Sequence, residues 1–369
     1  MSFAKLRTLP FLVLLLPLDF IVACVILIGD VAFLPLRIGR RIPLQYAPAT
    51  LTSVTIQILN WDGLLLLKEC LPSVTEAVRR HSERTGGKHR IAVVDNGSSD
   101  GSIAFLQEQY PEIHVIPLDR NYGFSIGNNK GFQEIRSDIV VLLNNDMIVA
   151  PDFLQPLLAP FADPDVFAVS SQIYFQDAGK RREETGNTRG RFEHGFFRLW
   201  HEDVLPADEK RAAFPILWAG GGSCAVDLRK LRTIGGFDPL YHPFYVEDTD
   251  ISWQAWKRGW KCLFAPGSHV VHKHRGTSRP KFGDDRVDRT IRRNQYLFVW
   301  KNVTDIGLVM QHLLALPRIH GSAILQKGFR TELRSYLAAV ARLPLALSRR
   351  IANLRSYAVG DRDVLRSSQ

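Results

Sequence analysis

Apolar, strand-like runs alternate with helical stretches across the middle of this chain, and this order restricts the fold more than any other feature. We expect strands at residues 54–59, 90–94, 114–117 and 139–143. We expect helices between them at residues 65–84 and 102–110. Strands and helices that alternate at this spacing favour a largely parallel sheet covered by helices. The sequence therefore predicts an α/β fold.

Polar residues follow three of the predicted strands at the point where each strand ends. They are Asn60 and Asp62, Asp95 and Asn96, and the run from Asn144 to Asp146. The carboxyl ends of parallel strands meet at one edge of a sheet, and ligands bind there. One such residue alone would be interpreted as a turn residue. Three sets on one edge predict a binding site.

Two positions are candidates for metal binding. Asp146 directly follows an apolar strand. A hard divalent cation that bridges the phosphates of a diphosphate needs few protein oxygens, because the phosphates supply others. A second carboxylate would be expected two residues earlier, but that position holds Asn144. Further along, His272 and His274 follow an apolar run beside two cationic residues, which fits a metal or phosphate site, although a lone histidine is more often structural.

Glu247 and Asp248 are adjacent carboxylates that precede a helix expected at residues 251–258. Thr249 or Asp250 can cap that helix, and acids are favoured at helix N-termini. Capping does not account for Glu247 and Asp248, and either could act as a general base toward an attacking hydroxyl. Upstream, three consecutive glycines at 220–222 let the backbone approach a ligand closely, with a plain tight turn as the alternative.

The N-terminal region from residue 9 to 36 is almost wholly apolar. Its length permits a bilayer crossing, which takes about 20 helical residues. Asp19 would lie near the middle of such a span at a cost of about 2.5–3.5 kcal/mol, and Pro17 is close to it. The segment is expected to be one kinked helix or a re-entrant pair of arms, with a buried helix of a soluble core as the alternative.

The net charge of +10 is concentrated at the two ends of the chain. Residues 1–50 hold five Lys/Arg and two Asp (+3), residues 313–369 hold ten Lys/Arg and three Asp/Glu (+7), and residues 51–312 are neutral. This distribution fits an anionic membrane surface and argues against a nucleic-acid enzyme. The C-terminal tail has helical spacing with a basic face, as in an interfacial helix or a helix packed on the core.

The four cysteines are scattered along the chain. Their spacing predicts free thiols, with neither a zinc site nor a disulfide framework.

Several motifs, in their order, resemble family 2 glycosyltransferases with the GT-A fold, especially the rhamnosyltransferase-like bacterial branch. They run through TIQILNWDG, VVDNGSSDGS, RNYGFSIGNNKGF, VVLLNNDM, WAGGGSCAVDLRKLRTIGGFD, FYVEDTDISWQAWKRGW and VVHKHRGTS. The resemblance implies a Rossmann-like mixed, mostly parallel sheet flanked by helices. It also implies three parts, which are a membrane-associated segment (1–50), a GT-A domain (51–300) and a helical, basic C-terminal region (301–369).

The resemblance assigns a role to each matching residue. A nucleotide-sugar donor would contact Asn60, Trp61, Asp95, Asn121, Gly123, Asn128, Asn144 and Gly221. Asp248 would be the catalytic base, with Glu247 beside it on the acceptor side. Asp146 and His272, or His274 in its place, would bind a divalent metal, Mn²⁺ or Mg²⁺.

The implied reaction is a single inverting transfer from a UDP- or dTDP-sugar to a hydroxyl of a glycan or lipid-linked acceptor in cell-envelope polysaccharide or glycolipid synthesis. The implied location is the inner membrane, with the catalytic domain on its cytoplasmic face and no nucleic acid as partner. Two alternatives stay open. One is a non-catalytic nucleotide-sugar-binding protein, and the other is a nucleotidyltransferase, which would usually show a Gly-rich basic loop where this chain has Asn60-Trp61-Asp62-Gly63.

Overall fold

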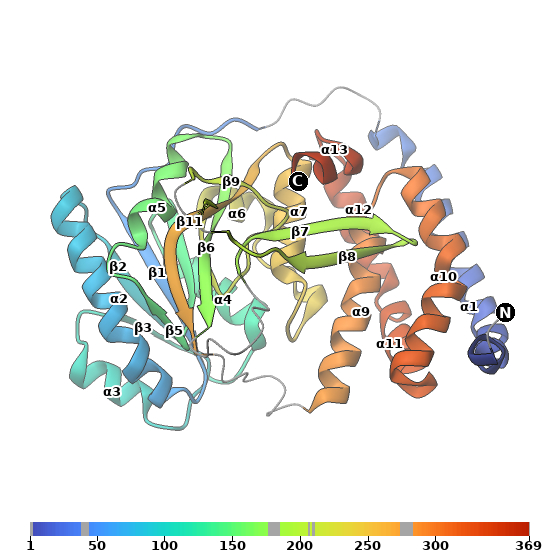
Figure 1. Cartoon of the computed structure of the whole chain (residues 1–369), viewed down its shortest axis with the longest axis horizontal. Coiled ribbons are helices and arrows are strands. Elements are labelled where there is room, and N and C mark those ends of the chain that lie inside the picture. The colour runs from blue at the N-terminus through green and yellow to red at the C-terminus, as the bar shows by residue number, and fades with distance from the viewer. Residues whose placement is uncertain are drawn as a thin grey trace.

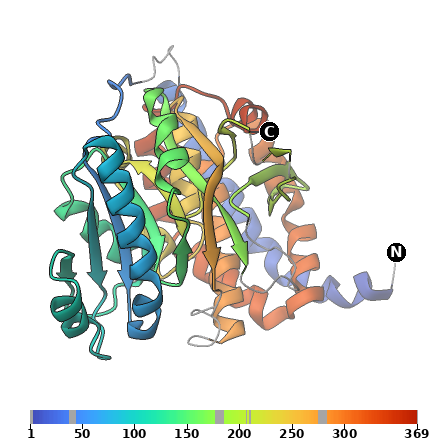
Figure 2. The same cartoon turned by 60° about the vertical axis from the view of Figure 1, so that its left-hand side comes forward.

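The computed structural model describes residues 3–37, 44–175, 185–205, 207–208, 211–273 and 283–368. A sheet covered by helices forms one side of the molecule, and a group of long helices forms the other (Figure 1). The N-terminal helix lies among the C-terminal helices on that second side, away from the first strands of the sheet (Figures 1 and 2).

The strands are β1 (Val54–Asn60), β2 (Arg90–Asp95), β3 (His114–Pro117), β4 (Ile139–Asn144), β5 (Met147–Val149), β6 (Val166–Phe175), β7 (Thr188–Glu193), β8 (Phe196–His201), β9 (Phe214–Pro215), β10 (Ser223–Asp227) and β11 (Lys261–His272). The α-helices are α1 (Phe3–Ala32), α2 (Leu64–Thr85), α3 (Ser102–Gln109), α4 (Gly123–Glu134), α5 (Leu154–Leu158), α6 (Leu228–Ile234), α7 (Glu247–Lys257), α9 (Asp284–Asn302), α10 (Ile306–Lys327), α11 (Phe329–Val340), α12 (Leu343–Leu354) and α13 (Asp361–Ser367).

The strands and helices predicted between residues 54 and 143 all form, with ends that agree to within a residue or two. Strand β4 shows why, because its five apolar residues Ile139–Leu143 are all buried, as expected for a strand covered on both faces. Helix α2 buries one apolar face and ends at Gly86, whose φ of 67° is the left-handed conformation that glycine adopts readily.

The main sheet has the order β3-β2-β1-β4-β10-β6-β11-β5, with β9 paired to β11. Strands β3, β2, β1 and β4 are mutually parallel. Strand β10 is antiparallel to both of its neighbours, and β11 is parallel to β6 but antiparallel to β5 and β9. The predicted mixed sheet is confirmed, and its parallel part places the carboxyl ends of β1, β2 and β4 on one edge.

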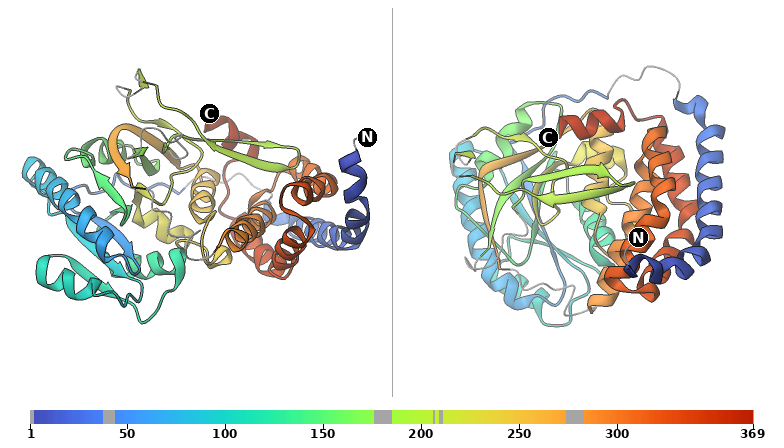
Figure 3. Two further views of the ribbon diagram at one scale, coloured as in Figure 1. Left: turned by 60° about the horizontal axis from the view of Figure 1, so that its bottom comes forward. Right: turned by 45° about the vertical axis from the view of Figure 1, so that its right-hand side comes forward.

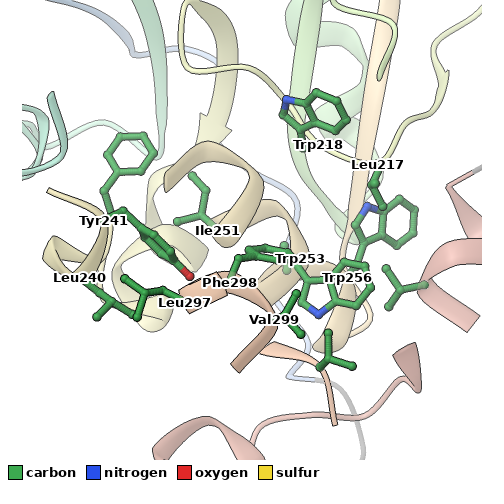
Figure 4. Packing of buried hydrophobic residues seen from close by; sticks show 14 of the residues in the cluster. Leu217, Trp218, Leu240, Tyr241, Ile251, Trp253, Trp256, Leu297, Phe298 and Val299 are labelled. Atoms are coloured by element: carbon green, nitrogen blue, oxygen red, sulfur yellow. The ribbon is translucent and has the colours of Figure 1, made fainter. Parts of the chain in front are cut away.

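Helices α7 and α9 join the sheet to the helical side of the molecule through a shared aromatic core (Figure 4). Trp253 of α7 meets Phe298 of α9 edge to face, with ring centroids 5.9 Å apart, an arrangement that aromatic pairs favour. The β7–β8 hairpin also packs here, because Phe197 contacts both rings.

Helix α7 corrects one prediction. It begins at Glu247 and not at residue 251, so Glu247 and Asp248 lie in its first turn. The residue before it, Val246, has a φ of 80° and provides no side-chain cap. Such a backbone conformation is rare for a β-branched residue, and the sequence pattern gave no reason to expect it. Asp250 is therefore not the cap of this helix.

The N-terminal apolar segment forms a single helix, α1, that contains Pro10 and Pro17. Figure 3 shows its first turns bent away from the remainder, which runs beside α10. The predicted kinked helix is thus observed, whereas the re-entrant pair of arms is not. The four cysteines are free thiols, as predicted. In the C-terminal region, α11 packs on α9 with Tyr336 fully buried, as in the packed-helix alternative.

Candidate functional site

The ends of β1 and β2 lie side by side and carry two fully buried polar side chains. Asn60 pairs in register with Asp95, and its Nδ2 donates to Asp95 Oδ2 at 3.2 Å. The Asp95 Oδ1 atom accepts from the backbone N–H of Ser98 at 2.9 Å. The loop after β2 is therefore folded back onto the carboxylate, while Trp61 lies half-buried in the turn that follows β1.

A second loop, which leads into α4, attaches to the same edge through Asn96. The Asn96 Nδ2 donates to Asn121 Oδ1 at 3.0 Å, and Asn121 Oδ1 also accepts from the Gly123 N–H at 2.7 Å. Gly123 has a φ of 75°, and a Cβ there would meet the Pro243 carbonyl oxygen at 2.9 Å. Only glycine fits this close approach without strain.

Asn128, another buried residue of the predicted donor site, uses its whole side-chain amide in contacts within the protein. Its Oδ1 accepts from Gln57 Nε2 at 2.7 Å, and its Nδ2 donates to the Phe124 carbonyl at 3.0 Å. Both groups of its amide are used, and only 2% of the residue is exposed. Asn128 therefore joins α4 to β1.

Hydrogen bonds at the end of β4 connect the end of β1 to the glycine run at residues 220–222. Asn145 Nδ2 donates to Asn60 Oδ1 at 2.8 Å, and the Asn144 N–H donates to the Gly222 carbonyl at 2.9 Å. Next to it, the Gly221 N–H donates to Asp248 Oδ2 at 3.2 Å. A continuous row of contacts thus runs from the end of β1 to the first turn of α7.

Gly221 is tightly enclosed at this point. A Cβ there would come within 3.0 Å of the Phe124 ring and 3.9 Å of the Asp248 Cβ. The glycine run is therefore more than a surface turn, because it packs between the α4 loop and the acidic turn of α7.

The two carboxylates of α7 have different surroundings. Asp248 is half-buried, and its Oδ1 accepts from the Thr249 N–H at 2.7 Å. Glu247 is 5% exposed, and its Oε2 has no hydrogen-bond partner among the described residues. Burial raises the pKa of Asp248 above its usual range. Burial and then the charge of Asp248 raise the pKa of Glu247 to about 8, as expected for desolvated carboxyls.

The loop before these acids is held in a sparsely populated conformation. Tyr245 and Val246 have φ values of 71° and 80°. Such backbone strain persists only where the surroundings fix it, and it clusters at functional sites. Here the fully buried Asn294 of α9 donates through Nδ2 to the carbonyls of Tyr241, Phe244 and Tyr245 at 2.9, 3.1 and 2.9 Å. Asn294 lies 49 residues from Tyr245 and has no motif around it, so its role could not be predicted from the sequence.

Asp250 is structural. Its Oδ2 accepts from Lys301 Nζ at 2.7 Å, and its Oδ1 accepts from the Tyr241 hydroxyl at 2.8 Å. These contacts join α7 to α9 and fix the helix on which Glu247 and Asp248 lie.

Asp146 and His272 meet beside the end of β4. Strand β5 pairs with β11, which places His272 opposite Met147, and His272 Nε2 lies 3.1 Å from Asp146 Oδ2. Both side chains are largely buried. His274, the alternative ligand in the sequence prediction, lies outside the described residues.

A carboxylate oxygen and an imidazole nitrogen at this distance fit two ligands of one divalent cation. Within the described part of the chain, no cluster of three or more His, Cys, Asp or Glu residues could hold a metal unaided. The pair therefore fits a cation only if a bound diphosphate or water completes its coordination.

A separate cavity of about 390 Å³ lies between α9, α10, α11 and the tip of the β7–β8 hairpin. None of the predicted site residues lines it. The site described above is instead a row of contacts at the carboxyl ends of β1, β2 and β4.

The model of the glycosyl transferase family 2 matches residues 56–225. The chain contains a family 2 glycosyltransferase domain. The matched range includes β1, β2, β4 and the glycine run, so the family predicted from the motifs is confirmed.

A rhamnosyltransferase is among the relatives. The chain is 24% identical over 206 residues to the N-acetylglucosaminyl-diphospho-decaprenol L-rhamnosyltransferase of Mycobacterium tuberculosis, covering 49% of this chain and 66% of that protein. The chain thus spans just under two thirds of the relative's length.

Two solved structures share the fold. The first is GalNAc-T7 with UDP, GalNAc and Mn²⁺ (TM-score 0.53, 19% identity, 68% of this chain and 48% of that chain). The second is Staphylococcus aureus TarS 1–349 with UDP-GlcNAc (TM-score 0.53, 11% identity, 85% of this chain and 91% of that chain). At these identities, the likeness supports the GT-A-like fold of the domain.

Proposed function

We propose that this protein is an inverting glycosyltransferase that moves one sugar from a nucleotide-diphosphate sugar to an acceptor hydroxyl. One observation carries the proposal. The half-buried Asp248, with a raised pKa, lies in the same row of contacts as the strand ends at which the domain would bind its donor. Asn60, Trp61, Asp95, Asn121, Gly123, Asn144 and Gly221 would surround the donor.

Asp248 is our candidate base. A base must accept the acceptor's proton as its oxygen attacks the sugar carbon, and a raised pKa makes a carboxylate a stronger proton acceptor near neutral pH. The Gly221 N–H and the Thr249 N–H hold its two oxygens in place. Glu247, whose pKa is raised to about 8, would be mostly protonated at neutral pH and would contact the acceptor without competing for that proton. A direct displacement of this kind leaves the sugar inverted and needs no nucleophile on the enzyme.

We propose Asp146 and His272 as the protein ligands of a divalent cation, Mn²⁺ or Mg²⁺. A bound cation would neutralise charge on the departing diphosphate. The 3.1 Å approach of the two side chains supports the pairing. Asn145 and Asn144, next to Asp146, would orient the sugar-phosphate end of the donor without adding negative charge.

The proposed donor is a UDP- or dTDP-sugar, and the proposed acceptor is a glycan or lipid-linked hydroxyl in cell-envelope polysaccharide or glycolipid synthesis. The mycobacterial relative's name supports an acceptor of this class. Residues Thr8–Ala32 of α1 are long and apolar enough to cross a membrane. We therefore propose the inner membrane as the location, with residues 51–300 as the catalytic domain on the cytoplasmic face and residues 1–50 and 301–369 as the parts that attach it.

Calorimetric binding of UDP, dTDP and GDP, each with and without Mn²⁺, tests the donor site. We expect metal-dependent binding of one nucleotide, lost in Asp146→Ala. Binding followed by no transfer to any acceptor extract would favour a non-catalytic binding protein. Release of pyrophosphate from a nucleoside triphosphate and a sugar phosphate would favour a nucleotidyltransferase.

A further inference from the structure

One face of helix α1 packs against the C-terminal helices along much of its length. Leu15, Val22 and Ile26 are buried on that face, and the helix packs against α10 and α12. Between Leu15 and Asp30 the attached stretch is about 22 Å long at 1.5 Å per residue. This distance approaches the thickness of a bilayer's hydrocarbon core, which is about 30 Å.

Both acidic residues of α1 point into that contact. Asp30 makes a two-pronged ion pair with Arg350 of α12, with Nε–Oδ1 and Nη2–Oδ2 distances of 2.8 and 2.7 Å. Asp19 Oδ1 lies 3.0 Å from His320 Nε2 of α10 and accepts from the Tyr336 hydroxyl of α11 at 2.7 Å. The two acidic groups that would oppose contact with lipid are therefore turned toward partners within the protein, through Oδ1 of Asp19 and both oxygens of Asp30.

The opposite face of α1 is apolar and exposed. Its largest exposed side chains recur at helical spacing and include Val13, Leu14, Phe20, Ile21, Ile28 and Val31. Residues that recur in this way form one stripe along a helix. Phe20, the largest of these side chains, is 70% exposed. A stripe of this length marks an interaction surface.

Neighbouring helices extend the stripe. Gly321 of α10 faces α1, because a Cβ there would lie 3.8 Å from Leu12 Cδ1. Leu314 and Leu325 lie seven residues before and four residues after Gly321, which is the same side of the helix, and both are exposed. The start of α11 is also close, since Phe329 stacks on Phe11 with centroids 4.3 Å apart.

Basic side chains accompany this apolar surface. Arg330 follows Phe329 and is exposed, as is Arg334 one turn later. The C-terminal region 313–369 has a net charge of +7. Basic residues beside an apolar helix face are the pattern of binding to a bilayer with anionic headgroups.

The packing of α1 on α10 and α12 restricts how α1 can be oriented in that bilayer. If α1 crossed it, α10 and α12 would have to enter the hydrocarbon beside it over the same length. Helix α12 packs on α9, which in turn packs on α7 of the catalytic domain. Helix α10 is joined to α9 by the hydrogen bond from Trp300 Nε1 to His312 Nε2 at 3.1 Å, and it exposes Arg318 to solvent. A charged side chain at the bilayer centre is costly, so the crossing orientation is disfavoured.

We propose that α1 lies in the plane of an anionic bilayer, with its apolar stripe in the headgroup–acyl boundary and both of its ends on the side of the catalytic domain. This inference rests on the membrane association proposed above and is independent of the sugar-transfer chemistry. Lipid of the bilayer would therefore cover the exposed apolar stripe of α1.

Labelling in membrane vesicles tests the orientation. Ser2→Cys before α1 and Glu108→Cys on the exposed surface of α3 are made separately in a Cys24→Ser background, because the other three cysteines are buried. We expect a membrane-impermeant maleimide to label both positions from the same side of the membrane. Labelling of position 2 from the opposite side would show a crossing helix and overturn the proposal.

Flotation of the full-length protein with vesicles tests the surface. Phe20→Glu should weaken binding to phosphatidylglycerol-containing vesicles about tenfold or more, because it puts a charge into the apolar stripe. Leu65→Glu is the matched control, since Leu65 is 66% exposed on α2 in the catalytic domain and should leave binding unchanged. Equal binding of wild type and Phe20→Glu would overturn the proposal, as would a wild type that binds no vesicles. Activity on a soluble acceptor analogue, measured in parallel, reports separately on the proposed transferase.

Discussion

The amide of Gly221 donates to Oδ2 of Asp248 at 3.2 Å, across 27 residues of sequence. Through this bond the glycine run fixes one carboxylate oxygen, while Thr249 fixes the other. The Asp248 side chain is thus positioned by backbone groups, which leave little rotational freedom to the carboxylate that we propose as the general base.

Asp248→Asn should abolish turnover while nucleotide binding persists. Asparagine keeps the oxygen that accepts from Gly221 but cannot take a proton, so we expect kcat to fall by about 10²–10⁴-fold. Calorimetric binding of the donor nucleotide should change little. Glu247→Gln is the comparison variant, and a larger loss there than in Asp248→Asn would move the base to Glu247.

Glu247 should make the protein less stable as the pH rises. Its pKa is raised from 4.5 to about 8 in the folded protein, so between these values the folded state binds a proton that the unfolded state has lost. Stability from this group is therefore greatest at low pH, declines as the pH rises from about 4.5 to about 8, and is constant above. In Glu247→Gln this contribution is absent. Thermal unfolding of both proteins across this range checks the prediction, and Tm curves that stay parallel would contradict it.

Asp146→Ala should remove the metal dependence of nucleotide binding. In wild type we expect Mn²⁺ to tighten binding, because the cation would join the diphosphate to Asp146 and His272. In the variant, affinity with Mn²⁺ should fall to the metal-free value. Glu69→Gln is a nearby control, since Glu69 pairs with Lys273, the residue after His272, at 2.7 Å. Unchanged metal dependence in Asp146→Ala would place the cation elsewhere.

Asn294→Ala should lower kcat and stability together, with little change in the KM for the donor. The substitution removes the amide that donates to the carbonyls of Tyr241, Phe244 and Tyr245, two of these bonds being buried and the third part-buried. A buried carbonyl left without a donor costs about 1–3 kcal/mol in stability. The strained turn at Tyr245 and Val246 would also relax. Steady-state kinetics and thermal unfolding test this. A stability loss with unchanged kcat would show that Asn294 supports the fold only.

Arg350→Ala should destabilise the protein by about 3–5 kcal/mol, because it removes the two charge-assisted hydrogen bonds that Arg350 donates to the buried Asp30. The double variant Asp30→Ala with Arg350→Ala should recover part of that loss. Arg349→Ala is the matched control, since Arg349 is half-exposed on the same helix and exposed pairs contribute about 0–1 kcal/mol. Denaturant unfolding of the four detergent-solubilised proteins gives the comparison, and equal effects of the two single variants would contradict it.

The sequence predicted the first half of the sheet well, because strands such as β4 are apolar on both faces and end at polar residues. It also placed Asn60, Asp95 and Asp146 on one edge, where the structure has them. It could not predict the start of α7, which depends on a left-handed Val246 and on Asn294 of another helix, whose amide bonds the carbonyl of the preceding Tyr245. Nor could it predict the role of Asp19, whose partners His320 and Tyr336 lie 301 and 317 residues away.

Helix α9 carries Asn294 and Tyr296 two positions apart. Asn294 fixes the turn before Glu247, and the Tyr296 hydroxyl donates to Glu332, which in turn contacts His320, the partner of Asp19. A short chain of hydrogen bonds through α9 therefore connects α1 to the acidic turn of α7. With α1 lying flat in a bilayer, this connection would hold Asp248 at one fixed height above the membrane, so the length of an acceptor's headgroup would determine whether its hydroxyl reaches the base.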